Sequence, residues 1–216
     1  MIKENLKKRF LTSLALFSIF FLLISQNLIL IFILIIFFVI SILEFLNLTI
    51  KINRNKVFFF FLNFFFIIYI STLFIFFFYL TSFPQSKIIA FSILTTCISS
   101  DIGGFIFGKL FKGPKLTKIS PNKTYSGVLG SLIFSVIFFC SLIFFFTKNF
   151  NLAILLVGVI TSTGSQIGDL FFSYLKRKAK IKDTGNLLPG HGGILDRLDS
   201  LLIGFPVGFL SLTILF

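Results

Sequence analysis

The sequence predicts an all-α, polytopic integral membrane protein with about seven transmembrane helices and a cytoplasmic N-terminus. Of its 216 residues, 56% are hydrophobic and only 12% are charged, and the mean hydropathy is +1.06. Soluble domains average about 25% charged residues, so a water-soluble fold of this composition could not cover its surface with polar groups. The same composition excludes a disordered chain, a fibrous protein and a small disulfide-bonded scaffold.

Seven apolar runs account for the predicted helices. A membrane-spanning helix needs about 20 residues, so the chain has room for these spans and short connections but for no separate soluble domain. The runs cover residues 10–24, 28–50, 57–80, 88–107, 127–146, 151–175 and 194–216. No small-x-small cleavage site follows the first run, so we expect a retained span rather than a removed signal peptide.

Polar breaks separate the runs, and the basic residues in them predict the orientation. The breaks lie at residues 25–27, 51–56, 81–85, 108–126, 148–149 and 176–193. With the N-terminus inside, every one of the 20 basic residues except Lys87 and Lys148 lies on the cytoplasmic side, as the positive-inside rule requires. Topology therefore explains the net charge of +13. We expect no nucleic-acid partner, but a cationic face that attracts the anionic lipids of the bilayer.

Acidic residues are scarce, so their positions are informative. The chain has seven of them: Glu4, Glu44, Asp101, Asp169, Asp183, Asp196 and Asp199. A carboxylate inside an apolar span is costly and indicates a functional site. Asp196 and Asp199 are three residues apart and share one helix face, where a cation or a proton must separate two carboxylates. If the sixth and seventh spans pack antiparallel, Asp169 lies near Asp196.

Carboxylates that converge beside lysines and glycines suit Mg²⁺, which proteins usually hold with one or two carboxylates plus substrate phosphates. The alternative is that Asp169 or Asp199 only pairs with Arg197 or with a lysine. The two cysteines, Cys97 and Cys140, both lie in apolar runs, and we expect them to be packing residues.

The two long inner loops carry features that suit phosphate binding. The loop at residues 182–193 reads KDTGNLLPGHGG, contains the single histidine, His191, and leads directly into the seventh span. Exposed glycine N–H groups beside a helix N-terminus form an anion site, although such a loop can also be a plain turn. In the other loop, Lys123 lies beside the hydroxyls of Ser120 and Thr124. A P-loop is excluded there, because the preceding Gly-x-x-x-x-Gly is missing.

Both loops also match a known pattern. The residues that match are Ser173-x-Leu175-Lys176-Arg177, Lys182-Asp183-x-Gly185, Leu188-Pro189-x-His191-Gly192-Gly193-x-x-Asp196-Arg197-x-Asp199 and, upstream, Asp101-x-Gly103-Gly104-Phe105, Gly108, Ser120-Pro121-x-Lys123-Thr124, Gly127 and Gly168-Asp169. Over roughly residues 95–205 the chain thereby resembles the phosphatidate cytidylyltransferases, or CDP-diacylglycerol synthases. It departs from that family at Ser126, where members usually have an acidic residue, and it is shorter than typical members.

The resemblance implies an activity in phospholipid biosynthesis: CTP and phosphatidic acid give CDP-diacylglycerol and pyrophosphate. It implies residues 1–94 as N-terminal transmembrane helices and residues 95–216 as the catalytic region with two cytoplasmic loops. It also implies a multi-pass protein of the cell (inner) membrane whose active site faces the cytoplasm, and it leaves a homodimer open.

The resemblance also implies a set of site residues and a Mg²⁺ cofactor, with a second cation left open. The catalytic candidates are Asp169, Asp196, Asp199, Lys182, Asp183 and His191. The substrate-binding candidates are Ser120, Lys123, Thr124, Lys176, Arg177, Gly192, Gly193 and Arg197. The metal-binding candidates are Asp169, Asp196 and Asp199.

Other functions remain open at this stage. A CTP-dependent lipid-alcohol kinase would use similar groups, but it would need a base for the hydroxyl and would release no pyrophosphate. A non-catalytic membrane scaffold subunit fits the short N-terminal half and Ser126. A transporter is disfavoured, because its ionisable residues would lie near the middle of several spans, whereas here they gather at the predicted cytoplasmic ends.

Overall fold

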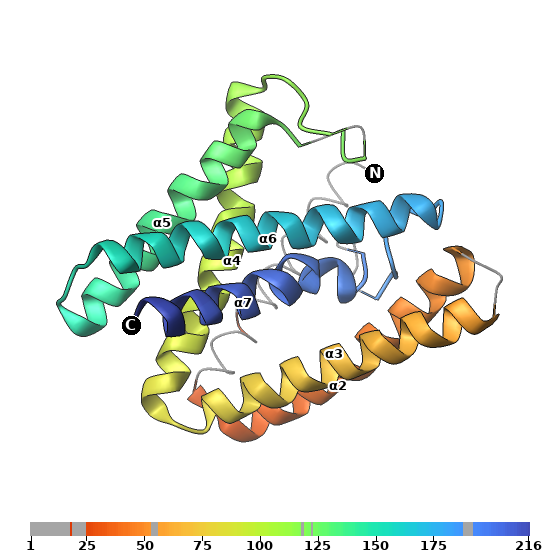
Figure 1. The fold of residues 1–216 in the computed structure, drawn as a ribbon, viewed down its shortest axis with the longest axis horizontal. Helices are drawn as coiled ribbons and strands as arrows, with labels where there is room; N and C mark the ends of the chain where they lie inside the picture. Colours follow the sequence, from red (N-terminus) through yellow and green to blue (C-terminus); the bar gives the residue numbers. More distant parts are fainter. Residues whose placement is uncertain (1–17, 19–24, 53–55, 118, 122, 188–191) are drawn as a thin grey trace. The chain divides into compact units, whose positions relative to one another are not determined.

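Long α-helices form most of the protein (Figure 1). A computed structural model describes residues 18, 25–52, 56–117, 119–121, 123–187 and 192–216. Within these ranges the helices are α2 (Asn27–Ile52), α3 (Lys56–Thr81), α4 (Pro84–Phe111), α5 (Tyr125–Thr147), α6 (Leu152–Lys178) and α7 (Leu195–Leu215). All 6 are long and apolar enough to cross a membrane. The predicted all-α, multi-pass class is therefore confirmed. Of the span predicted at residues 10–24 only residue 18 is described, so that span and the cytoplasmic N-terminus stay predictions.

Several helices extend beyond their predicted limits. Helix α4 begins at Pro84 and continues through Gly108 to Phe111, so the predicted boundaries at residues 88 and 107 are wrong. Proline fits the first position of a helix because its missing N–H would have no helical partner there. The basic residues Lys176, Arg177 and Lys178 form the last turn of α6 instead of the following loop. Cations are favoured at that end by the helix dipole.

The chain divides into two compact units. The first unit comprises Met1–Phe83 and Leu175–Leu198, and the second comprises Pro84–Tyr174 and Asp199–Phe216. The division at residue 94 was drawn from expected function rather than from contacts, and it stays a prediction.

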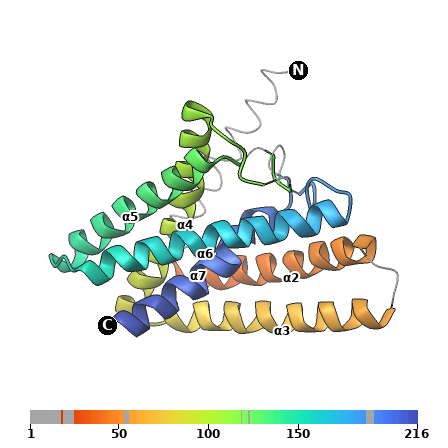
Figure 2. The same cartoon turned by 45° about the horizontal axis from the view of Figure 1, so that its top comes forward.

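In the first unit, α2 and α3 run side by side and antiparallel (Figure 2). The rings of Phe45 and Phe66 stack with centroids 3.7 Å apart. Near the end of α2, the Thr49 hydroxyl donates to Asn63 Oδ1 over 3.1 Å and accepts from its Nδ2 over 3.0 Å. Asn63 is buried, and its Nδ2 also donates to the Phe59 carbonyl over 2.7 Å. Both N–H groups of the amide therefore have an acceptor, as a buried polar group requires.

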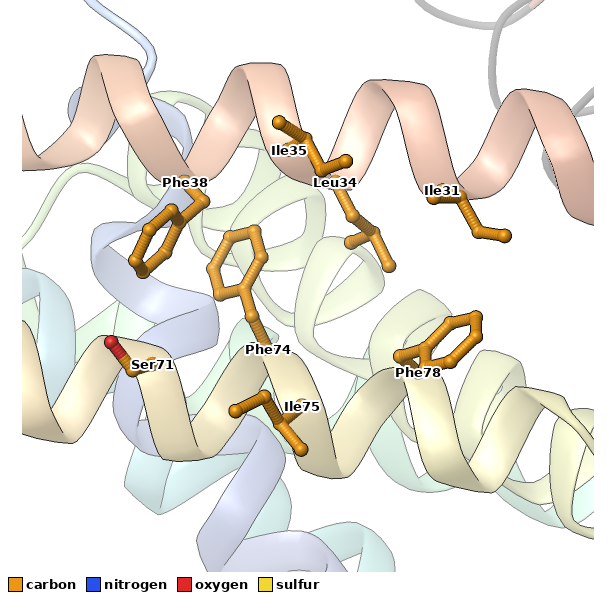
Figure 3. Close-up of a pocket in the computed structure, with 8 residues that line it drawn as sticks. All are labelled: Ile31, Leu34, Ile35, Phe38, Ser71, Phe74, Ile75 and Phe78. Carbon is orange, nitrogen blue, oxygen red and sulfur yellow. The ribbon is translucent and has the colours of Figure 1, made fainter.

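An apolar groove of about 340 Å³ lies between α2 and α3 (Figure 3). Its lining residues are Ile31, Leu34, Ile35, Phe38, Ser71, Phe74, Ile75 and Phe78. The one hydroxyl among them, on Ser71, donates to the carbonyl of Ile67 over 2.6 Å. None of the lining residues is charged and none is a predicted site residue, so the groove is not the predicted site.

In the second unit, glycines bring the helices close together. A Cβ on Gly130 of α5 would overlap the side chain of Phe107 and lie 2.7 Å from the carbonyl oxygen of Gly103 on α4. Between α6 and α7, Gly164 contacts Val207 and Gly168 contacts the backbone of Asp199. The residue numbers rise on one helix and fall on the other, so these two segments pack antiparallel. Small residues permit this close approach.

Replacing Gly130 by leucine tests the α4–α5 contact. We expect Gly130→Leu to lower the free energy of unfolding by about 3 kcal/mol, because an overpacked core must shift. Thermal and denaturant unfolding in detergent measure the change. Ser141→Leu is the matched control, since Ser141 is an exposed residue of the same helix and surface changes usually stay within about 0.5 kcal/mol. Equal stabilities of the two variants would contradict the contact.

Candidate functional site

The carboxylate of Asp196, in the first turn of α7, is the centre of a cluster in the first unit. Its Oδ1 lies 2.9 Å from Lys176 Nζ. Its Oδ2 accepts the backbone N–H groups of Thr184, over 2.8 Å, and Gly193, over 3.0 Å. The Lys176 and Asp196 side chains are only 11% and 5% exposed. The end of α6, the loop after it and the start of α7 are therefore tied to one carboxylate.

Gly192 and Gly193 allow the loop to pass this carboxylate closely. Gly192 has a φ of +80°, in the left-handed region that favours glycine. A Cβ at Gly192 would lie 2.8 Å from Asp196 Oδ2. The two glycines were predicted as substrate-binding residues, and the structure places both within the Asp196 cluster.

A second buried carboxylate, Glu44 of α2, binds the same loop. Its Oε1 accepts the N–H of Ile194 over 3.1 Å, and its Oε2 accepts the N–H of Leu195 over 2.9 Å. Oε2 also accepts the hydroxyl of Thr184 over 2.8 Å. The first N–H groups of a helix have no partner within it, and Glu44 supplies one for α7. An acidic residue inside an apolar helix is a signal that is visible in the sequence, but no role was predicted for Glu44.

In the second unit, Lys123 pairs with Asp169 of α6. Lys123 Nζ lies 2.6 Å from Asp169 Oδ2, and the two side chains are 23% and 32% exposed. Ser173 donates to Asp169 Oδ1 over 3.2 Å. The backbone N–H of Lys123 donates to the carbonyl of Ser120, and Thr124 caps α5 by accepting the N–H of Gly127 over 3.1 Å. The predicted phosphate-binding residues Ser120, Lys123 and Thr124 therefore belong to one compact turn.

Ser126 closes the loop that carries Lys123. Its hydroxyl donates to the carbonyl of Lys112 over 2.6 Å and shares a hydrogen bond of 2.9 Å with the Thr124 hydroxyl. Lys115 and Thr124 form an isolated antiparallel bridge within the same loop. A carboxylate at position 126 could not donate to the Lys112 carbonyl, so the departure from the usual acidic residue has a structural consequence.

The remaining candidates are more dispersed. Asp199 of α7 is 7% exposed, and its Oδ1 accepts the N–H of Ser200. The hydroxyl of Ser200 donates to Asp101 Oδ2 over 2.7 Å, a contact that sequence analysis missed. Of the others, the following are exposed: Arg177, Lys182, Asp183 and Arg197. His191 lies outside the described residues. Asp169 and Asp196 belong to different units, so their proximity stays a prediction.

The chain also matches a known protein family along most of its length. The model of the cytidylyltransferase family matches residues 2–215 of the chain. The chain belongs to the cytidylyltransferase family. It is 43% identical to the phosphatidate cytidylyltransferase of Staphylococcus haemolyticus over 133 residues. The matched residues make up 61% of this chain and 51% of that protein. The Staphylococcus aureus enzyme of the same name is 42% identical over the same shares. The phosphatidate cytidylyltransferase of Helicobacter pylori is 45% identical over 119 residues, which make up 52% of this chain and 42% of that protein.

This member of the cytidylyltransferase family spans about half the length of the curated relatives it matches. Among its described residues, no group of three or more His, Cys, Asp and Glu side chains could hold a metal ion by itself. Mg²⁺ needs only one or two carboxylates when substrate phosphates supply the other oxygens. The carboxylate of Asp169 is partly exposed and lies beside a lysine. It is therefore chemically suited to be one of these Mg²⁺ ligands.

Removing the lysine of the buried pair tests the Asp196 cluster. We expect Lys176→Met to lower the free energy of unfolding by about 3 kcal/mol, because it leaves a buried carboxylate without its counter-charge. Adding Asp196→Asn to this variant is expected to recover part of the loss. Denaturant unfolding in detergent measures both. Lys178→Met is the control, since Lys178 is an exposed residue one position beyond Arg177. A double variant no more stable than Lys176→Met would contradict the pairing.

Proposed function

We propose that this protein transfers CMP from CTP to phosphatidic acid, giving CDP-diacylglycerol and pyrophosphate for phospholipid biosynthesis. The observation that carries the proposal is its identity of 42% to 45% to bacterial proteins named phosphatidate cytidylyltransferase. The membership in the cytidylyltransferase family, over residues 2–215, supports a nucleotidyltransferase reaction. The two lysine–carboxylate pairs support the binding of polyanionic substrates.

The proposed reaction needs no protein base. An oxygen of the lipid phosphate attacks the α-phosphorus of CTP and forms the new P–O bond. The bond from the α-phosphorus to the bridging oxygen breaks, and its electron pair leaves with pyrophosphate. Phosphate monoesters have a second pKa of about 6, so the nucleophile is already ionised at neutral pH. The work of the protein is to align two anions, reduce their repulsion and stabilise the leaving pyrophosphate.

The two lysines suit different parts of this work. Lys123 is partly exposed and follows Ser120 in a tight turn, so we assign it to direct phosphate binding with Ser120 and Thr124. Lys176 is buried against Asp196, so we assign it to orienting that carboxylate. The exposed Arg177, Lys182 and Arg197 suit the charge of the nucleotide and of pyrophosphate. Gly192 and Gly193 are proposed to bring the backbone close to substrate.

We further propose Mg²⁺ as the cofactor, with a second cation open, and Asp169, Asp196 and Asp199 as its carboxylate ligands. When bound, Mg²⁺ neutralises phosphate charge and stabilises the leaving group. Asp183 and His191 are proposed to order the loop or to assist proton transfer. Either residue could order the loop without taking part in proton transfer.

The protein crosses a lipid bilayer several times, because the 6 long apolar helices among its described residues have no other suitable environment. We propose the cell (inner) membrane as its location, since the compared relatives come from bacteria. We also propose that the active site faces the cytoplasm, where CTP is available, and that a second copy of the chain is a partner in a homodimer.

A direct assay tests the proposed reaction. Purified protein with Mg²⁺, phosphatidic acid and CTP labelled in cytidine is expected to move label into lipid and to release an equal amount of pyrophosphate. Asp169→Asn is expected to lower kcat at least about 100-fold, a typical loss when one charge-stabilising group is removed. Thr163→Val is the control on α6, because the Thr163 hydroxyl is exposed and donates to Ile160 of its own helix.

Other outcomes identify the alternatives. CDP formed from CTP in the presence of a lipid alcohol, without pyrophosphate, would indicate a lipid kinase. If the protein is shown to be folded but forms no product in either assay, the result would indicate a scaffold subunit. Full activity of Asp169→Asn would remove Asp169 from the proposed metal and phosphate site.

A further inference from the structure

We propose that Glu44 is a positioning residue for this reaction, and that it acts by fixing the loop that orients Asp196. The inference rests on the proposed function for its catalytic consequence, but its structural part can be measured without activity. Glu44 lies on α2, outside the sequence patterns that carry the family resemblance. Its side chain nevertheless makes contacts with the loop before α7 and with the first residues of that helix.

The environment of Glu44 requires a fixed geometry. Glu44 as a residue is only 7% exposed, and burying a charged group is costly unless hydrogen bonds compensate. Compensation comes from the N–H groups of Ile194 and Leu195 and from the Thr184 hydroxyl. Such hydrogen bonds to an ionised acceptor are stronger than neutral ones. The start of α7 and the loop at Thr184 are therefore anchored to α2.

Thr184 joins Glu44 to Asp196. Its hydroxyl donates to Glu44 Oε2 over 2.8 Å, while its backbone N–H donates to Asp196 Oδ2, also over 2.8 Å. Gly193 also touches both carboxylates. Its N–H donates to Asp196 Oδ2, and a Cβ on it would overlap both Glu44 oxygens. Two carboxylates thus bind the same two chain segments.

This arrangement links Glu44 to the orientation of the Asp196 side chain. Because Oδ2 is held by the Thr184 and Gly193 N–H groups, Oδ1 is presented to Lys176. Loss of the Glu44 anchor frees Thr184 and the start of α7, and Asp196 then loses its fixed orientation. A misplacement of about 1 Å can lower a rate about 100-fold. A residue that touches neither substrate can therefore control the rate.

Glu44→Gln is the decisive substitution. Glutamine keeps the size of the side chain, but its NH₂ group cannot accept a hydrogen bond, so at least one of the three donors is left facing another donor. We expect kcat to fall at least about tenfold, with KM for both substrates within about threefold, because an orientation is lost rather than a binding contact. Thr184→Val removes the hydroxyl alone. Combined with Glu44→Gln, it is expected to add less than its separate effect, since the two residues share a contact.

A second measurement reads the anchor directly. Hydrogen exchange followed by mass spectrometry is expected to speed up at least about tenfold at the backbone N–H groups of Thr184, Gly193, Ile194 and Leu195 in Glu44→Gln, while exchange in α4 and α5 is unchanged. This readout does not depend on catalysis. If the wild-type protein proves inactive in the CTP assay, the proposed function fails, and the exchange result alone decides whether Glu44 anchors the loop.

Thr49→Val is the matched control for a merely structural effect. Thr49 lies on the same helix, and its side chain makes its hydrogen bonds with Asn63 and with the Leu46 carbonyl rather than with the loop. We expect this variant to lower Tm with kcat within about twofold of wild type and with unchanged loop exchange. Wild-type kcat or unchanged loop exchange in Glu44→Gln would overturn the proposal. A fall in kcat equal to that of Thr49→Val at the same loss of Tm would also overturn it.

Discussion

A buried carboxylate in an apolar protein needs partners, and the first unit is organised around the partners of Asp196. Lys176 supplies the counter-charge over 2.9 Å, and two backbone N–H groups occupy the other oxygen. Neither charge can stay in an apolar environment without the other. The end of α6, the following loop and the first turn of α7 therefore have little freedom to separate. Gly185, Gly192 and Gly193 follow from this constraint, because larger residues at these positions would collide with the carboxylates of Glu44 or Asp196.

The two lysine–carboxylate pairs have similar distances but different environments. Lys123 and Asp169 remain partly exposed, whereas Lys176 and Asp196 are almost fully enclosed. An exposed ammonium can leave its partner to bind an incoming phosphate at little cost, because exposed ion pairs contribute little stability. An enclosed one cannot do so without leaving a buried charge. This contrast favours substrate binding by the first pair and orientation by the second.

Much of the second unit is shaped by its small residues. Gly103 and Gly130 bring α4 and α5 into backbone contact, and Gly164 and Gly168 do the same for α6 and α7. In a membrane, where apolar surfaces gain little by leaving lipid, close packing of this kind is a main source of helix association. Ser126 adds a local constraint by binding the Lys112 carbonyl, which closes the loop that presents Lys123.

The sequence by itself determined the membrane class, the described apolar helices, the loop that carries Lys123 and the loop that lies between Lys176 and Asp196. These features depend on local composition, because a helix in lipid satisfies its own backbone. Helix ends were predicted less well, as at Pro84, since proline can begin a helix as readily as it can end one. Only the tertiary structure decided which side chains pair. Glu44 and Thr184 are 140 residues apart, and no local pattern specifies a contact between segments so distant in the chain. Burial within the folded protein makes that contact necessary, because the charge of Glu44 must find hydrogen-bond donors there.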